Sequence, residues 1–133
     1  MNLIKDELYK HPDIFIARSD VHRWGVFTDS DLDEGSVIEE APYCEFKDKE
    51  VKRSKVLIRY CYGSDNSDTK DCVFGFGFAP LYNHSSEPNV KYELDVVNQC
   101  MRHYAIRDIE EGEELLIDYG AGDEWGEDDY CTD

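Results

Sequence analysis

The sequence is short of basic residues. Of its 133 residues, 14 are lysine or arginine and 31 are aspartate or glutamate, so its net charge is −17 at neutral pH. A protein that binds a phosphate backbone needs a basic surface, so this balance argues against direct nucleic-acid binding. The same charge favours a lysine- and arginine-rich protein partner, because long-range attraction speeds their encounter.

Long apolar runs are also absent. No segment approaches the roughly 18 apolar residues of a membrane-spanning helix, so no membrane contact is expected. Residues 1–10 include Lys5, Asp6 and Glu7 and lack the apolar centre of a signal peptide. We therefore expect an intracellular protein.

Closely spaced metal ligands are missing too. The five cysteines are Cys44, Cys61, Cys72, Cys100 and Cys131, and no two of them have the two-to-four-residue spacing of a zinc knuckle. The four histidines also lack ligand spacing. Free thiols in a reducing compartment are the simplest interpretation, and no metal site is expected.

The apolar residues that are present, 41% of the chain, are enough for one core. The length suits a single domain, since domains most often have roughly 100–150 residues. We expect one domain over residues 1–133, with its core at about 14–120 and an acidic C-terminal tail at 121–133. This length leaves no room for a targeting module, so substrate choice is expected to rest on the domain's own surface or on a homodimer.

Short stretches rich in β-branched and aromatic residues predict a mostly β fold with few short helices. The predicted strands are residues 13–17, 25–27, 36–40, 101–106 and 114–118. Alternation in the fourth places Arg102, Tyr104 and Ile106 on one face. A loose helical stripe predicts one helix over residues 47–62.

One acidic turn occurs twice. Residues 31–38 and 108–115 each place a glycine, Gly35 or Gly112, after acidic residues and before a strand. Glycine supplies the positive φ that such turns need. We interpret the two copies as the same local turn used twice.

Phenylalanine and glycine alternate over residues 74–78. A phosphate-binding loop would open a helix, whereas Pro80 and turn residues follow this run. We expect Gly75 and Gly77 to mark a close approach of the backbone to neighbouring groups or a β-bulge.

Three further segments combine residues that can carry chemistry. They are Asn83-His84-Ser85-Ser86-Glu87-Pro88-Asn89, Glu114-Leu115-Leu116-Ile117-Asp118-Tyr119-Gly120 and His22-Arg23-Trp24-Gly25-Val26-Phe27. Taken singly, the first fits an ordinary polar turn, and the other two fit aromatic side chains packed at strand ends.

Taken together and in this order, the three segments resemble the SET domain of protein-lysine methyltransferases. Residues 83–89 match the family's N-H-S-x-x-P-N motif, and residues 114–120 match E-L-x-x-D-Y-G. The segment at 22–27 matches G-x-G-V/L-F/R in part, because Arg23 stands where the first glycine is expected. The resemblance covers about Ile14 to Tyr119 and implies several small β-sheets around a C-terminal pseudoknot.

The resemblance implies S-adenosyl-L-methionine as the cofactor and Tyr119 as the catalytic residue. Tyr119 is assigned orientation and electrostatics, because a phenol with a pKa of about 10 is a poor base at neutral pH. The implied cofactor-binding residues are Arg23, Trp24, Gly25, Asn83 and His84. The implied substrate-channel residues are Tyr60, Tyr62, Ile117 and Trp125.

Two departures from relatives refine this picture. Many relatives have a cysteine after N-H-S and a cysteine-rich tail that complete a zinc site, whereas this chain has Ser86 and a single tail residue, Cys131. No metal is therefore expected. Relatives often carry Phe or Tyr two residues before the catalytic tyrosine, where this chain has Ile117, which favours di- or trimethylation.

The implied function is transfer of methyl groups to the lysine ε-amine of a basic protein tail, with histone H3 the family's commonest substrate. Two alternatives remain open: a non-histone basic substrate, and a catalytically weak SET-like module that binds basic peptides. An acidic histone mimic would explain the charge but not the three motifs. A histone substrate would place the protein in the nucleus, and another substrate would place it in the cytoplasm.

Overall fold

The computed structural model describes residues 4–47, 54, 60–63 and 72–119, and the structural statements below concern these residues. The described chain is mostly β, as predicted. Its strands are β1 (Ile14–Arg18), β2 (Trp24–Thr28), β3 (Val37–Phe46), β4 (Tyr62–Gly63), β5 (Cys72–Gly75), β6 (Asn83–His84), β7 (Val90–Asp95), β8 (Cys100–Ala105) and β9 (Glu114–Ile117). A short 3-10 helix, η2 (Ala79–Leu81), precedes β6.

All five predicted strands are present, as β1, β2, β3, β8 and β9, and two of the predicted boundaries need correction. The strand predicted to end at Glu40 continues through Pro42 to Phe46. The pairing with β8 continues past Glu40 as far as Pro42, which lies opposite Cys100, and residues 43–46 pair with β5. The helix predicted over residues 47–62 lies mainly outside the described residues, and its last residue, Tyr62, belongs to strand β4.

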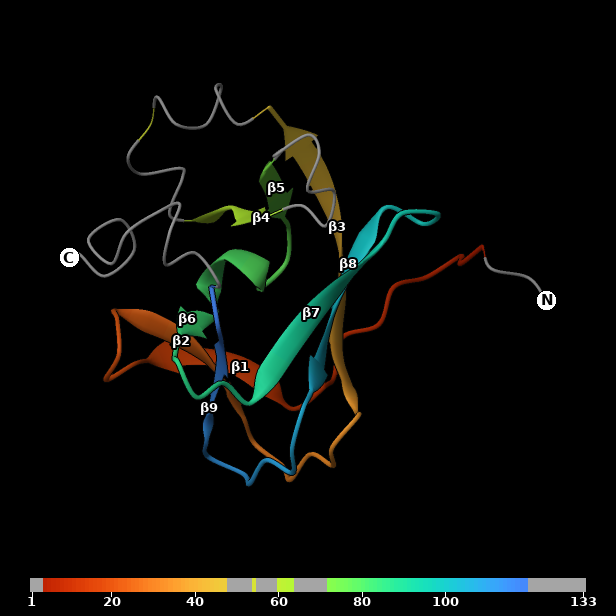
Figure 1. The fold of residues 1–133 in the computed structure, drawn as a ribbon. Helices are drawn as coiled ribbons and strands as arrows, with labels where there is room; N and C mark the ends of the chain where they lie inside the picture. Colours follow the sequence, from red (N-terminus) through yellow and green to blue (C-terminus); the bar gives the residue numbers. More distant parts are fainter. Residues whose placement is uncertain (1–3, 48–53, 55–59, 64–71, 120–133) are drawn as a thin grey trace.

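The strands form two sheets. One has the order β1-β2-β9-β6, and the other has the order β4-β5-β3-β8-β7. Figure 1 shows the long strands β3, β7 and β8 on one side of the molecule and the short strands β1, β2, β6 and β9 together on the other. The buried apolar side chains join the two groups into one core that includes Val26, Ile38, Val73, Met101, Ile109 and Leu115.

Strand β6 is paired in parallel with β9, with Asn83 opposite Leu116 and His84 opposite Ile117. This pairing places residues 83–84 beside the segment that ends at Tyr119. Asn89 strengthens the junction, since its side-chain amide donates to Glu114 O at 2.9 Å and its side-chain oxygen accepts from Leu116 N at 2.7 Å. Two of the three sequence motifs therefore meet.

The repeated acidic turn forms a reciprocal pair. Leu32 and Ile109 exchange backbone hydrogen bonds of 2.8 Å in both directions. Asp31 accepts from Glu111 N at 2.9 Å, and Asp108 accepts from Glu34 N at 2.8 Å. The predicted positive φ is confirmed at both glycines, which each have φ of 89°. The same turn is used twice, and the two copies bind each other.

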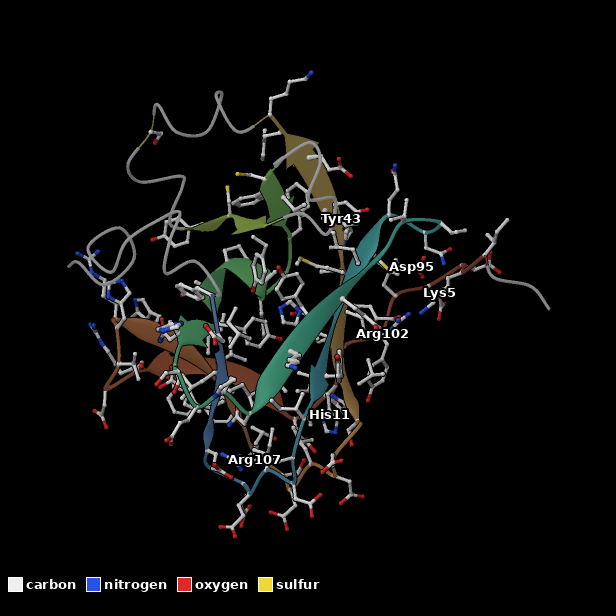
Figure 2. All side chains as sticks on the ribbon, in the orientation of Figure 1. Lys5, His11, Tyr43, Asp95, Arg102 and Arg107 are labelled. Atoms are coloured by element: carbon white, nitrogen blue, oxygen red, sulfur yellow. The ribbon has the colours of Figure 1, made fainter. Side chains whose placement is uncertain are left out.

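The N-terminal segment lies along β3. His11 N donates to Ile38 O at 2.8 Å, and Glu40 N donates to Tyr9 O at 2.6 Å. The Glu40 carboxylate is bonded by Lys5 and by Arg102, the latter at 2.9 Å. Figure 2 shows Lys5, Asp95 and Arg102 together on this side of the molecule. These contacts fix the backbone on both sides of Glu39.

Candidate active site

Asn83 is the centre of a hydrogen-bonded junction. It is 5% exposed, and its Nδ2 lies 3.1 Å from the carbonyl oxygens of both His22 and Trp24. The same nitrogen lies 2.8 Å from Glu114 Oε2. One side chain thus joins the loop before β2 to strands β6 and β9, and all three sequence motifs converge at it.

Glu114 completes this junction. Its Oε1 accepts from the Ser19 hydroxyl at 2.7 Å, while its Oε2 faces Asn83. A Cβ at Gly25 would lie 2.1 Å from Glu114 Oε2, so only glycine allows the carboxylate to approach the β2 backbone. Sequence reasoning matched Glu114 to a motif and gave it no role; its place in that motif was the available signal.

Arg23 has a φ of 34°, in the left-handed region that glycine adopts without strain. A glycine, which the motif has at this position, would adopt this conformation without strain. Arg23 and Trp24 are both exposed beside the Asn83 junction, and the guanidinium of Arg18 lies 4.4 Å from the Trp24 ring centroid. The positive φ therefore places backbone strain at one arginine of this loop.

His84 and Tyr119 are in direct contact. Tyr119 N donates to His84 Nδ1 at 3.0 Å, and the two rings are 5.1 Å apart between centroids. The Tyr119 hydroxyl donates to Tyr82 O at 2.9 Å. Because this bond uses the hydroxyl hydrogen, the Tyr119 oxygen can act only as an acceptor towards a further group.

A pocket opens beside Tyr119. Its lining residues are Tyr60, Cys61, Tyr62, Ala79, Pro80, Tyr82, Tyr92, Ile117 and Tyr119. Three of the four residues expected in the substrate channel (Tyr60, Tyr62 and Ile117) therefore line one pocket with Tyr119, and Trp125 lies outside the described residues. The walls are mainly aromatic.

Sequence reasoning missed two tyrosines of this pocket. Tyr82 was not among the residues expected in the substrate channel; it is a core residue, 1% exposed, and it also lines the pocket. Tyr92 lies in β7, where Val90, Tyr92 and Leu94 alternate with charged residues; that alternation was the signal for the strand. Burial raises the pKa of Tyr62 and of Tyr82 well above the usual value, so both hydroxyls stay neutral.

Neither a metal centre nor a membrane segment is found in the described part of the chain. No three residues of the His, Cys, Asp or Glu type gather there into a group that could hold a metal ion. No helix there is long and apolar enough to cross a membrane. The described cysteines Cys44, Cys61, Cys72 and Cys100 are free thiols.

Comparison with known proteins agrees with this arrangement. The SET domain family matches residues 23–120. The chain is 30% identical over 122 residues to an H3 lysine-4 specific histone-lysine N-methyltransferase of Aspergillus oryzae, and 31% identical over 115 residues to one of Saccharomyces cerevisiae. These matches cover 85% and 80% of this chain, which spans only 10% and 11% of the length of those relatives.

Solved structures show the same fold. A protein of Plasmodium falciparum, provisionally assigned as a histone methyltransferase, aligns with a TM-score of 0.66 at 28% identity, covering 83% of this chain and 95% of that one. CpSET8 from Cryptosporidium aligns with a TM-score of 0.64 at 24% identity, covering 80% and 57% of the two chains. The chain belongs to the SET-domain family.

Proposed function

We propose that this chain is a protein-lysine N-methyltransferase that uses S-adenosyl-L-methionine and acts on a basic protein tail. The observation that carries the proposal is the convergence of Asn83, His84 and Tyr119 at the edge of a tyrosine-lined pocket. A donor held on one side and a lysine inserted from the other would meet beside the Tyr119 hydroxyl.

The residues around Asn83 suit the proposed cofactor. S-adenosyl-L-methionine supplies an activated methyl group on a sulfonium, and it also carries an amino-acid end. Asn83 Nδ2 lies within hydrogen-bond distance of the carbonyl oxygens of His22 and Trp24, so Asn83 would hold the backbone against which the amino-acid end of the cofactor lies. Each of these carbonyl oxygens has a second lone pair that can accept from an ammonium group. His84 would contact the rest of the cofactor from the Tyr119 side.

The pocket suits a lysine side chain. The ε-amine must lose its proton before it attacks, and its unperturbed pKa is about 10.4. Aromatic walls remove water and disfavour the charged amine, which lowers this pKa. The pocket also holds the reactants in line, and aromatic faces tolerate the cationic product.

Tyr119 is proposed to orient the amine rather than to remove its proton. Its hydroxyl hydrogen is donated to Tyr82 O at 2.9 Å, so towards a substrate amine its oxygen could act only as an acceptor. The lone pairs of this oxygen can accept from the incoming amine and favour the partial positive charge around the transferred methyl group.

The substrate is proposed to be a histone tail, which would place the action in the nucleus. The curated relatives are named for histone H3 lysine-4, and a net charge of −17 favours a basic partner. A non-histone basic protein, and with it a cytoplasmic location, is the second candidate, because the charge alone does not distinguish basic tails.

The test is incubation with labelled S-adenosyl-L-methionine and a panel of purified histones and whole lysates, read on a gel. Label in H3 supports the proposal, and label only in another basic protein supports the second substrate. Calorimetric titration separates the enzyme from a peptide-binding module: heat with S-adenosyl-L-methionine is expected of the enzyme. No heat and no label would reject the proposed function.

A further inference from the structure

Glu39 and His103 form a buried polar pair beneath the pocket. They are opposite each other in the antiparallel pairing of β3 with β8. Glu39 is 2% exposed and His103 is fully buried. Directly opposed residues in a sheet point to the same face, and Tyr92, a pocket residue, is the partner of His103 on its other side. A carboxylate and an imidazole thus lie in one row with a pocket tyrosine.

The Glu39 carboxylate is hydrogen-bonded on both sides of the short helix η2 that forms part of the pocket. Its Oε1 accepts from the Tyr82 hydroxyl at 2.9 Å, and its Oε2 accepts from Phe78 N at 2.9 Å. A Cβ at Gly77, whose φ is 65°, would lie 2.4 Å from Oε2. The alternating Phe and Gly run therefore brings backbone against a buried carboxylate, which confirms the close approach expected from sequence.

His103 holds two pocket tyrosines. Its ring stacks on Tyr82 at 4.3 Å between centroids with an interplanar angle of 15°. Its Nε2 lies 3.1 Å from the Tyr62 hydroxyl, which itself donates to Ala79 O at 2.5 Å. Since the Tyr62 hydrogen is already used, Nε2 must carry the hydrogen and donate to the Tyr62 oxygen. This tautomer leaves Nδ1 as a bare acceptor, and Nδ1 has no partner among the described residues.

The hydrogen bonds of Glu39 and of His103 both connect to residues that line the pocket together with Tyr119. Glu39 fixes the hydroxyl end of Tyr82, and the carbonyl of the same residue receives the Tyr119 hydroxyl. His103 fixes Tyr62, and Tyr62 is tied to Ala79, another pocket residue. We propose that Glu39 and His103 are positioning residues for methyl transfer, which set the placement of Tyr82 and Tyr62 around the lysine; this rests on the proposed function.

A purely structural role accounts poorly for the pair. Buried polar groups are costly unless they are fully paired, and well-packed apolar residues often serve stability as well or better. His103 leaves one nitrogen without a partner, so the site gives up stability at that atom. The pair instead fixes the orientation of neighbouring groups, because each of its hydrogen bonds joins the backbone or a side chain of a segment that forms the pocket.

The first test is a double-mutant cycle on turnover. His103→Phe keeps the ring that stacks on Tyr82 and removes the donor to Tyr62, and it is compared with Tyr62→Phe and with the double variant. His103→Phe is expected to lower kcat about fivefold, the loss of one hydrogen bond, with cofactor affinity unchanged. The double variant is expected to match Tyr62→Phe. Independent multiplication of the two losses, or normal turnover in His103→Phe, would overturn the positioning role of His103.

Glu39 has its own pair of variants. Glu39→Gln keeps an acceptor for Phe78 N and a polar partner for Tyr82, whereas Glu39→Ala removes both. The expected order of kcat is wild type, then Glu39→Gln, then Glu39→Ala, with little change in cofactor affinity. Thr28→Val is the control. Thr28 lies in β2, outside the pocket lining, and the variant removes its fully buried hydroxyl, which donates to Ser30 O. If kcat falls as much in Thr28→Val as in Glu39→Ala, lost stability alone explains the fall, and the positioning role of Glu39 is overturned.

A readout without turnover keeps this inference separate from the proposed function. Tyrosine ring resonances, assigned by Tyr→Phe variants, are expected to shift for Tyr62 in His103→Phe and for Tyr82 in Glu39→Gln, each with the other spectrum little changed. Nitrogen spectra of labelled histidine are expected to show His103 with its hydrogen on Nε2. If the wild-type protein transfers no methyl group, the proposed function fails, and these spectra alone test the contacts of Glu39 and His103. Unshifted tyrosine resonances, or a His103 ring with its hydrogen on Nδ1, would reject those contacts.

Discussion

The hydroxyl of Tyr119 donates to the carbonyl oxygen of Tyr82 at 2.9 Å, across 37 residues of sequence. Tyr82 immediately precedes the Asn83-His84 strand, so this bond joins the last motif to the middle one between two residues that line the pocket. It also fixes the direction in which the Tyr119 lone pairs point. The proposed chemistry depends on this geometry.

Tyr119→Phe removes the hydroxyl and keeps the ring against His84. We expect turnover to fall by about 100-fold or more, in the range seen when one preorganised polar group is removed from an active site. Cofactor affinity should change little, because Tyr119 N still donates to His84, and the loss of the bond to Tyr82 O should lower the free energy of unfolding by only about 1 kcal/mol, so the fold is kept. Tyr104→Phe in β8, outside the pocket lining, is the control. Near-normal turnover in Tyr119→Phe would remove Tyr119 from its role.

Arg23→Gly should relieve strain. A non-glycine residue at a φ of 34° is held in an unfavourable conformation, so glycine is expected to raise the free energy of unfolding by up to about 1 kcal/mol. Arg23→Ala is the matched control, because it removes the guanidinium and keeps a Cβ at positive φ. Denaturant melts of both variants test this, and a Gly variant no more stable than the Ala variant contradicts it.

Ile117 predicts the number of methyl groups. It is 2% exposed and lines the pocket beside Tyr119, and it has no hydroxyl to order a water that would compete with added methyl groups. The saturated product should therefore be di- or trimethylated, and Ile117→Tyr should shift it towards the monomethyl form. Mass spectra of exhaustive reactions measure this. A wild-type product that stops at one methyl group would reject the idea.

His103 predicts a loss of stability in mild acid. Burial lowers its pKa from 6.5 to about 3, so the folded protein leaves the ring neutral where the unfolded chain protonates it. Between these values the unfolded state binds more protons; stability is complete above about pH 6.5 and falls as the pH drops, by the order of 1 kcal/mol per pH unit.

His103→Phe isolates this contribution. Burial raises the pKa of nearby Glu39, which acts in the opposite direction above its unfolded value, and the comparison of two proteins that both contain Glu39 cancels it. Denaturant melts from pH 7.5 to pH 5 should show wild type losing more stability than His103→Phe. Parallel slopes for the two proteins would contradict a buried neutral imidazole.

The sequence predicted the strands with a clear alternation. Residues 101–106 were assigned correctly, because β8 buries Met101, His103 and Ala105 while Arg102 and Tyr104 are only partly buried. The two-residue strand β6 carries no periodicity, and its partner lies 33 residues further along the chain, so only the likeness to a family could place it beside β9. The same likeness, rather than spacing, brought Asn83 and Tyr119 together.

The buried pair escaped prediction for a physical reason. A glutamate in a strand is normally a solvent-facing residue, and nothing local to Glu39 shows that its partners, Phe78 and Tyr82, lie 39 and 43 residues away. Gly77, which makes room for the Glu39 carboxylate, was singled out in the sequence, but the group that it approaches is set by tertiary packing.

The central claim is that cofactor and lysine meet at Tyr119. A crystal structure with S-adenosylhomocysteine and a lysine-containing H3 peptide tests it most directly. The account predicts the cofactor product against Asn83 and His84, with the lysine between Tyr62, Tyr82 and Tyr119 and its amine beside the Tyr119 hydroxyl. A cofactor product bound away from Asn83, or a peptide whose lysine stays outside the tyrosine-lined pocket, would contradict it.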